Sequence, residues 1–253
     1  MTVDAGEVVE RVAARPARSG LFLDLDGTLA PIVARPELAR VLPDARAVLP
    51  RLVGRVAVVA VVSGRPSDQV RELVDVDGVL AVGTHGVEGE PPMSSAVLDA
   101  IREVAASVGA WVEPKGAAAA VHFRGVEDPL AAATAAEPAL GAVAAANGLE
   151  LLGGKRILEL MPAGRPRKGG AVERISRDHG LEVVVFAGDD VGDLDAFAAL
   201  GRLGASGVWT CGVVSQGSET ASAVVEAGDF AVSGPPGVVT LLTAIADALD
   251  VAS

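Results

Sequence analysis

The sequence predicts an α/β protein with a core built on a parallel sheet and a smaller α/β lobe inserted into it. The core strands are predicted from short apolar runs that small polar residues follow at once; these are residues 21–23, 56–62, 79–82 and 183–187. Continuous apolar runs of this length are typical of strands buried on both faces, as in parallel sheets. Helical patterns at residues 67–74 and 169–179 alternate with the runs, which indicates right-handed βαβ units. Gly180 and Gly201 are expected to end two of the core helices.

Between residues 87 and 162 the pattern changes, which predicts the inserted lobe. Two helices are expected at residues 94–107 and 129–146, with four short strands at residues 110–115, 119–124, 149–152 and 156–161. This arrangement predicts an antiparallel sheet with its two helices on one side. The core domain would then comprise residues 1–86 and 163–253, and the cap domain residues 87–162.

Composition bounds the class of protein and its partners. Half of the 253 residues are apolar and 21% are charged, which is typical of a globular chain. No apolar run approaches the length of a membrane span, and acidic residues interrupt positions 1–20, so we expect a cytoplasmic protein without a secretion signal. The net charge of −12 argues against nucleic acid and membrane surfaces as partners. We expect a monomer. Cys211 is the only cysteine, which excludes an intrachain disulfide and a multi-cysteine zinc site.

Asp24 and Asp26 stand two residues apart, directly after the apolar run at residues 21–23. Ligands of open α/β sheets bind just outside the carboxyl ends of the strands, so these carboxylates are placed for chemistry. One carboxylate can attack phosphorus, while its neighbour protonates the leaving alkoxide and then activates water. The alternatives are an ordinary acidic turn or a calcium loop. An EF-hand loop that starts at Asp24 would need Glu at its twelfth position, where Arg35 stands.

Another strand end carries acidic residues that suit a metal ion. Asp189 is expected to hold Mg²⁺ together with Asp24 and the backbone carbonyl of Asp26, because magnesium at phosphate sites uses few protein oxygens. Asp190 and Asp193 are near enough in the sequence to orient those ligands. The positive charge of the ion would reduce the repulsion between an attacking carboxylate and a phosphate ester.

Donors for the phosphoryl oxygens are predicted at two helix starts. Ser63 and the amide of Gly64 follow the run at residues 56–62, where a strand leads into a helix. Lys168 precedes the helix at residues 169–179 and brings one positive charge. Each segment also has a purely structural explanation: a turn at Ser63, a surface lysine, and an acidic helix cap at residues 189–193. Their joint occurrence at strand ends favours a phosphoryl-transfer site.

The inserted lobe is expected to have one polar face. Residues i and i+2 share a face of a strand, so several hydrogen-bonding side chains should lie together. They are Glu113 and Lys115 with Trp111, His122 with Arg124, and Glu159. The opposite face is apolar and would pack on the two helices. Two interpretations of the polar face remain open: a solvated surface with cross-strand ion pairs, or a lid over a substrate with many hydroxyl groups.

The chain resembles the haloacid dehalogenase (HAD) superfamily of phosphohydrolases, which has four sequence motifs. The segments that resemble them are Asp24-Leu-Asp-Gly-Thr28, Ser63-Gly-Arg65, Lys168 and Gly188-Asp-Asp-Val-Gly-Asp193. Within that superfamily, further segments look like those of trehalose-6-phosphate phosphatases: Gly83-Thr-His-Gly-Val-Glu88, Val112-Glu-Pro-Lys115, Val121-His-Phe-Arg124 and Leu158-Glu-Leu-Met-Pro162. The resemblance extends over nearly the whole chain.

The resemblance implies a Rossmann-like HAD core with an inserted α/β cap, Mg²⁺ dependence, and hydrolysis of trehalose 6-phosphate through an aspartyl phosphate on Asp24. It also implies that substrate contacts are made by Gly64, Arg65, His85, Glu113, Lys115, Arg124 and Glu159. The alternatives are a phosphatase of another disaccharide-like or glyceryl-glycoside phosphate, a phosphomutase, and a sugar-phosphate sensor without turnover.

The last motif departs from the family pattern, which usually reads Gly-Asp-Asp-x-Thr-Asp-Glu. This chain has Gly192 and Leu194 at the Thr and Glu positions. The aspartates expected at the metal are retained, so hydrolysis is still expected. The departure puts in doubt the local support of the site and the identity of the sugar.

Overall fold

The computed structural model describes residues 3–83, 91–154, 156–163 and 168–251. The chain divides into two compact units. Met1–Val33, Glu37–Gly86 and Pro166–Ser253 form the first, called the core unit here; Ala34–Pro36 and Val87–Arg165 form the second, the cap unit. The expected domain boundary after residue 86 lies outside the described residues, and the division at residues 162 and 163 remains a prediction.

The core unit is built on a six-stranded parallel sheet with the order β10-β9-β8-β1-β2-β3. The strands are β1 (Ser19–Leu23), β2 (Val58–Val62), β3 (Leu80–Val82), β8 (Val183–Gly188), β9 (Trp209–Gln216) and β10 (Phe230–Ser233). All five pairings are parallel, so the carboxyl ends of the six strands lie along one edge of the sheet. The predicted parallel α/β core is confirmed.

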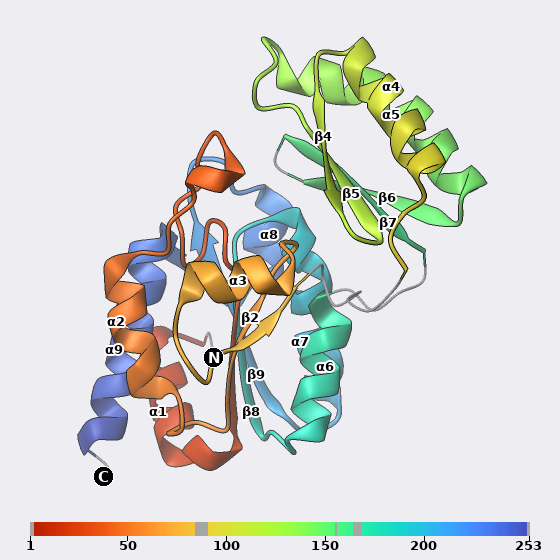
Figure 1. Cartoon of the computed structure of the whole chain (residues 1–253). Coiled ribbons are helices and arrows are strands. Elements are labelled where there is room, and N and C mark those ends of the chain that lie inside the picture. The colour runs from red at the N-terminus through yellow and green to blue at the C-terminus, as the bar shows by residue number, and fades with distance from the viewer. Residues whose placement is uncertain (1–2, 84–90, 155, 164–167, 252–253) are drawn as a thin grey trace. The chain divides into compact units, whose positions relative to one another are not determined.

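Helices cover both faces of this sheet, as Figure 1 shows. One face packs on α1 (Ala5–Ala14), α2 (Pro43–Leu52), α3 (Ser67–Val74) and α9 (Gly234–Val251), and the other on α6 (Lys168–Asp178), α7 (Leu194–Ala205) and α8 (Ser222–Ala227). Short 3₁₀ turns lie at Pro16–Arg18, Pro36–Leu38 and Val191–Asp193. Successive residues of β1 enter opposite layers: Leu21 and Leu23 pack in one, and Phe22 in the other. A strand buried on both faces needs the continuous apolar sequence that predicted it.

The two glycines expected to end helices behave differently. Gly180 follows α6 and has φ 58°, the left-handed conformation that glycine adopts without steric cost. The expectation for Gly201 is wrong, because α7 continues through it to Ala205. Ala199 and Leu200 are buried in this helix. Their packing outweighs the roughly 1 kcal/mol that a glycine costs in a helix interior.

The cap unit holds a four-stranded antiparallel sheet with the order β4-β5-β7-β6. Its elements are α4 (Ser95–Ser107), β4 (Trp111–Lys115), β5 (Ala118–His122), α5 (Pro129–Ala146), β6 (Leu149–Gly154) and β7 (Ile157–Pro162). Val121 and Leu160 of the sheet pack with Ile101 of α4 and Leu140 of α5 in one apolar cluster. The predicted antiparallel lobe with two helices on one side of its sheet is confirmed.

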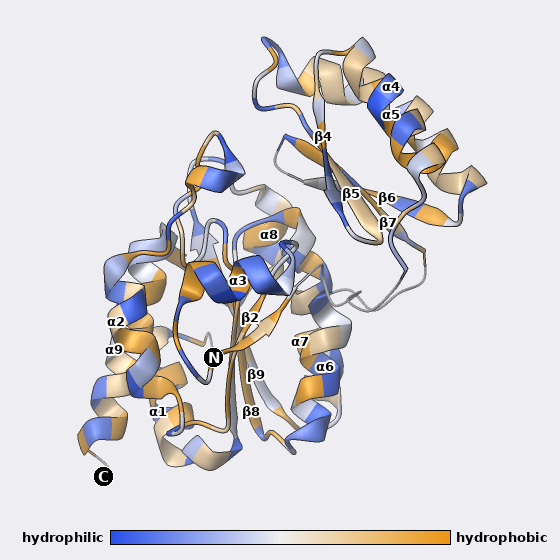
Figure 2. Cartoon of the chain, viewed as in Figure 1, coloured by the Kyte–Doolittle hydropathy of each residue, from blue (hydrophilic) through white to orange (hydrophobic). Residues whose placement is uncertain are grey.

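Helix α5 is long and apolar enough, by length and composition, to cross a membrane. Its apolar character comes mainly from alanine, as the pale colour of most of this helix in Figure 2 shows. Ala136, Leu140 and Ala144 pack in the cap cluster. The helix is continuous, but Glu137 and Pro138 interrupt its apolar sequence near the middle. We therefore interpret α5 as a packing element of the cap. The expected absence of a membrane partner stays a prediction.

Cys211 lies in the middle of β9 and is fully buried. Burial, with smaller contributions from the carboxylates of Asp229 and Glu7, raises the pKa of its thiol to about 12. The thiolate is the reactive form of cysteine, so a raised pKa leaves very little of it near neutral pH. The position of Cys211 fits a structural role in the core.

The native protein should therefore react slowly with a thiol reagent such as dithionitrobenzoate. At about pH 8 we expect its rate to be at least about a hundredfold below that of the guanidinium-unfolded chain, because both access and thiolate fraction are reduced. Absorbance of the released thionitrobenzoate measures both rates. The unfolded chain is the control and should release one equivalent, since the sequence has one cysteine. Equal rates in the two states would show that the thiol is accessible and ionised.

Candidate active site at the carboxyl edge of the core sheet

Asp24 follows the last residue of β1 and is buried at the carboxyl edge of the sheet. Its backbone N–H donates to the carbonyl of Ala187 in β8 at 2.8 Å, which continues the ladder between these two strands. The chain then turns at once, because the carbonyl of Leu25 accepts hydrogen bonds from the N–H groups of Leu29 and Ala30, both at 2.9 Å. The turn fixes the position from which the Asp24 carboxylate leaves the strand.

Lys168 is the first residue of α6, and the structure brings it directly onto Asp24. Its Nζ lies 2.6 Å from Oδ1 of Asp24 and 2.7 Å from Oδ1 of Asp193. The lysine is only 4% exposed, so its charge is held almost entirely by these two carboxylates. The interpretation of Lys168 as a solvated surface lysine is thereby excluded.

Asp193 links three parts of this edge. Its Oδ1 accepts from Lys168, and its Oδ2 accepts from the backbone N–H groups of Asp189 at 2.9 Å and Asp190 at 3.0 Å. Asp190 in turn caps the 3₁₀ turn Val191–Asp193 with its own side chain. Because both oxygens of Asp193 accept hydrogen bonds, its geometry fits a residue that orients its neighbours.

Asp189 completes a group of buried carboxylates. One carboxylate oxygen from each of Asp24, Asp189 and Asp193 lies within 4.8 Å of the others. Gly27 lies against this group with φ 92°, and a Cβ there would meet the Asp189 carboxylate. Only glycine fits at this position, because the left-handed backbone and the close approach both exclude a side chain. The Ser215 hydroxyl of β9 donates to the Gly27 carbonyl at 2.6 Å and supports the turn.

Burial of these charges in one place changes their proton affinities. Burial raises the pKa of Asp24 well above its usual range; Lys168 opposes this, and the carboxylates of Asp193 and Asp189 add to it. Burial alone would lower the pKa of Lys168, but the carboxylates of Asp193 and Asp24 outweigh it, and the net shift is upward. The lysine is therefore protonated at neutral pH, and three carboxylates share one positive charge.

The chemistry of this group fits a hard divalent cation. Three carboxylates and one ammonium leave a formal excess of two negative charges in a buried place. A divalent ion would balance that charge, and its oxygen ligands would be carboxylates, as magnesium prefers. Asp24 and Asp189 are the residues that would hold it, with Asp193 behind them.

Asp26, Ser63 and Arg65 form a second part of the same edge. The guanidinium of Arg65 binds the Asp26 carboxylate in a fork, with Nε 2.6 Å from Oδ2 and Nη2 2.8 Å from Oδ1. Ser63 is buried at the end of β2, and its Oγ accepts the backbone N–H of Arg65 at 3.2 Å. β1 and β2 are adjacent in register, with Leu23 beside Val61, so Asp24 and Ser63 leave neighbouring strand ends. Sequence reasoning did not anticipate the Arg65–Asp26 fork.

Gly192 and Leu194, which depart from the family pattern, lie beside this edge. A Cβ at Gly192 would meet open space, so glycine is not required there by packing. Leu194 begins α7 and packs against the apolar layer that contains Phe186 and Phe197. Although the chain departs from the family pattern at these two positions, Asp193 still accepts hydrogen bonds from Lys168 and from the N–H groups of Asp189 and Asp190.

In the cap unit, the predicted polar face is brought together by strand pairing. Lys115 Nζ lies 2.8 Å from Glu159 Oε1 and 3.9 Å from Glu113 Oε2, and His122 Nε2 lies 2.8 Å from the same Glu113 oxygen. Arg124 is half-buried just beyond the end of β5. These cross-strand contacts fit either interpretation of this face, a solvated one or a lid. His85 lies outside the described residues.

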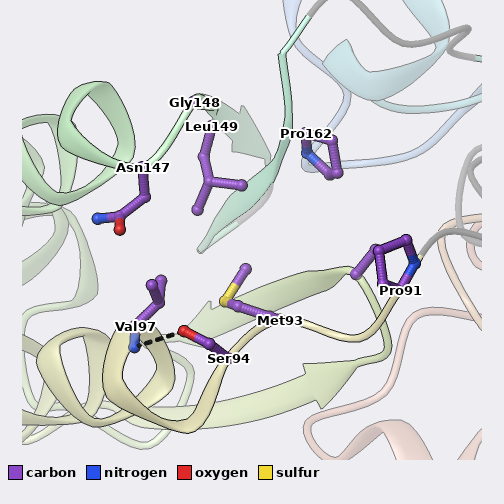
Figure 3. Close-up of a pocket in the computed structure, with 9 residues that line it drawn as sticks. Pro91, Met93, Ser94, Val97, Asn147, Gly148, Leu149 and Pro162 are labelled. Carbon is purple, nitrogen blue, oxygen red and sulfur yellow. Dashed lines mark hydrogen bonds between the residues drawn. The ribbon is translucent and has the colours of Figure 1, made fainter.

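A pocket of about 330 Å³ lies elsewhere in the cap unit (Figure 3). Met93, Val97, Leu149 and Pro162 supply its apolar lining. The hydroxyl oxygen of Ser94 accepts a hydrogen bond from the N–H of Val97 at 3.4 Å and so caps the start of α4. None of the described residues that line this pocket is charged, so it does not suit a phosphate group.

Replacing Gly27 by Ala should destabilise the protein more than the same change at Gly54. Both glycines have positive φ, but only a Cβ at Gly27 would meet other atoms, those of Asp189. We expect the free energy of unfolding to fall by at least about 1 kcal/mol more in Gly27→Ala, because a rigid contact adds to the backbone strain. Urea unfolding of both variants measures the difference. Equal losses would mean that the turn yields and that the close approach is not a constraint.

Comparisons with known proteins identify a matching family and several relatives. Residues 22–227 match the Trehalose-phosphatase family. A probable trehalose-phosphate phosphatase 4 of Oryza sativa is 32% identical over 220 residues, covering 77% of this chain and 59% of that protein. An uncharacterized glycosyl hydrolase of Mycobacterium tuberculosis is 37% identical over 207 residues, covering 72% of this chain and 15% of that protein. The chain thus spans only part of the length of these relatives.

Solved structures support the same fold. The C-terminal domain of the C. albicans trehalose-6-phosphate phosphatase has a TM-score of 0.81 at 17% identity, over 97% of each chain. A haloacid dehalogenase-like hydrolase from Bacteroides thetaiotaomicron has a TM-score of 0.61 at 16% identity, over 89% of this chain and 98% of the other. The predicted HAD fold, a core with an inserted cap, is confirmed. The match over residues 22–227 shows that the chain belongs to the trehalose-phosphatase family.

Proposed function

We propose that this chain is a magnesium-dependent phosphatase that hydrolyses trehalose 6-phosphate through an aspartyl phosphate on Asp24. The observation that carries the proposal is the buried contact of Lys168 with Asp24 and Asp193, at 2.6 and 2.7 Å. It places a carboxylate and a fixed positive charge side by side at the carboxyl edge of the sheet. Family membership supports the choice of substrate.

In the first step, Asp24 is the nucleophile. Lys168 donates a hydrogen bond to Oδ1 of Asp24, so we expect the other carboxylate oxygen, Oδ2, to attack phosphorus. A new bond forms between Oδ2 and phosphorus, and the bond from phosphorus to the sugar oxygen breaks. The leaving alkoxide takes a proton from Asp26. The structure holds Asp26 as a carboxylate in the Arg65 fork, so this step requires the fork to open and Asp26, whose side chain is one third exposed, to take up a proton from solvent first. Bound Mg²⁺ would supply charge neutralisation between the carboxylate and the phosphate dianion.

In the second step, water releases the phosphate. Asp26, now a carboxylate, takes a proton from a water molecule that attacks phosphorus, and the bond from phosphorus to Asp24 breaks. Ser63 already accepts the Arg65 N–H through its oxygen, so its hydroxyl hydrogen can be donated to a phosphoryl oxygen, as can the amide of Gly64. Lys168 stays on the Asp24 carboxylate and lowers the cost of restoring its charge.

The residues of the cap would select the sugar. Glu113, Lys115 and Glu159 form one connected set of carboxylates and an ammonium on the polar face of the cap sheet. Such groups donate and accept hydrogen bonds in the manner that sugar hydroxyls require. We assign Arg124 to the same surface, and His85 as a substrate residue by family resemblance.

The same proposal covers partners and location. The proposed enzyme is a monomer. The net charge of −12 supports a small sugar phosphate as the partner in place of nucleic acid or an anionic membrane. A cytoplasmic location is part of the same proposal.

Substitution of Asp24 by Asn should abolish turnover and leave the fold intact. The two side chains have nearly the same shape, but the amide cannot attack phosphorus, so we expect phosphate release to fall by at least about a thousandfold. Asp44→Asn, which makes the same change at an exposed position of α2, is the matched control and should retain activity. Substantial turnover by Asp24→Asn, with an unchanged circular dichroism spectrum, would remove Asp24 from the nucleophilic role.

Phosphate release from a set of substrates tests the reaction and its metal dependence together. The set is trehalose 6-phosphate, sucrose 6-phosphate, glucosylglycerol phosphate and glucose 6-phosphate, each assayed with Mg²⁺, with EDTA, and with Mg²⁺ restored. We expect the highest kcat/KM for trehalose 6-phosphate and no release under EDTA, because the excess of two negative charges beside Lys168 then lacks a balancing cation. Preference for another member of the set would correct the substrate. Full activity under EDTA would contradict the metal assignment, and transfer of phosphate to sugar instead of water would indicate a mutase.

A further inference from the structure

Trp111 is an exposed aromatic side chain on the polar face of the cap sheet. It is 45% exposed, although large aromatic residues are normally covered in a folded protein. Its β4 position places it on the same face as Glu113 and Lys115, since alternate residues of a strand share a face. We propose that Trp111, backed by His122, is a platform on which one pyranose ring of the substrate stacks. This inference rests on the proposed function and names a specificity-determining residue for it.

His122 holds the indole in place from behind. The two rings are stacked, with centroids 4.0 Å apart and planes 7° from parallel. Strand pairing sets Trp111 directly opposite His122 on β5. His122 is 5% exposed, so one face of the indole is covered and the exposed area lies on the other face and the ring edge. A rigid aromatic plane loses little conformational entropy when a ligand binds to it.

His122 also connects the platform to the polar residues of the cap. Its Nε2 lies 2.8 Å from Oε2 of Glu113, and Lys115 lies 3.9 Å from that same oxygen. Lys115 in turn contacts Glu159 at 2.8 Å. One continuous chain of contacts thus runs from the indole through the imidazole to the Glu113 carboxylate, and from there through the Lys115 ammonium to the Glu159 carboxylate. The aromatic surface and the hydrogen-bonding groups are held in a common, fixed arrangement.

This combination matches the chemistry of a sugar ring. A pyranose has C–H bonds on its ring faces and hydroxyl groups around its edge, so it needs an apolar plane flanked by polar groups. Trp111 supplies the plane, while Glu113 and Lys115 supply acceptors and donors beside it. The competing explanation is that Trp111 only covers His122 at the edge strand of the sheet. The two explanations differ in what happens when sugar is added.

Kinetics provide the first test. Trp111→Ala should raise KM for trehalose 6-phosphate about tenfold, the usual size of one lost aromatic contact, and change kcat little. Trp111→Phe keeps an aromatic plane and should raise the KM for trehalose 6-phosphate less than Trp111→Ala does. For p-nitrophenyl phosphate, which carries no sugar, kcat/KM of both variants should stay within about twofold of the wild type. Equal losses with both substrates would show a structural role and overturn the platform.

Fluorescence provides a test that does not depend on turnover. The chain has two tryptophans, so Trp209→Phe leaves Trp111 as the single emitter. Trp209 lies in β9 of the core unit, and its ring faces the guanidinium of Arg11 at 5.6 Å. Titration with trehalose should change the emission of the Trp209→Phe protein saturably. The matched control, Trp111→Phe, retains only Trp209 and should show no change.

The outcomes separate this inference from the function on which it rests. If the wild type hydrolyses trehalose 6-phosphate but Trp111 emission does not respond and Trp111→Ala has normal KM, the platform is wrong and the function stands. If the wild type releases no phosphate from trehalose 6-phosphate while trehalose still changes Trp111 emission, the function is wrong and a sugar-binding surface remains. A response of both single-tryptophan proteins would point to a global change and overturn the platform.

Discussion

The buried ammonium of Lys168 is the interaction on which the rest of the site depends. A lysine charge inside a protein is costly unless carboxylates hold it. Here two carboxylates hold it, Asp24 after β1 and Asp193 in the turn after β8, and these residues are 169 positions apart in the sequence. Its helix start must come close to α7, since the N–H of Gly169 donates to Asp195 at 2.8 Å and a Cβ at Gly169 would meet the Asp195 backbone. The glycine after the lysine is therefore a requirement of packing.

The parallel sheet explains why this convergence is possible. β1 lies between β8 and β2, so the chain leaves three adjacent strands at the same edge with Asp24, Asp189 and Ser63. Each strand is covered on both faces by helices, which keeps water from the sides of the sheet and leaves the edge as the place where polar groups gather. A bound cation would balance the excess of negative charge at that edge, and this would link metal binding to the stability of the site.

In the proposed function, the two units divide the chemical work. The core would act on any phosphate ester, because its carboxylates, lysine and buried serine would recognise the phosphoryl group and not its substituent. The cap carries a different set, in which an indole, an imidazole, two carboxylates and an ammonium are joined by cross-strand contacts. Under this proposal, substitutions in the cap would change the preferred sugar without altering the phosphoryl chemistry. The departure at Gly192 and Leu194 affects the core side, where the contacts of Asp193 are nevertheless formed.

The sequence by itself determined the class of fold, the spans of most elements, and the identity of the charged residues at the core edge. α3 and α5 begin and end where the pattern predicts, because apolar periodicity reports local burial directly. β9 and β10 escaped notice, since Thr210 and Gly212 interrupt the apolar run of β9 and that of β10 is only Phe-Ala-Val. Only the tertiary structure decided that Arg65 binds Asp26, that Ser215 supports Gly27, and that α7 passes through Gly201. These contacts depend on the order of strands in the sheet and on packing between distant segments, which a local pattern does not encode.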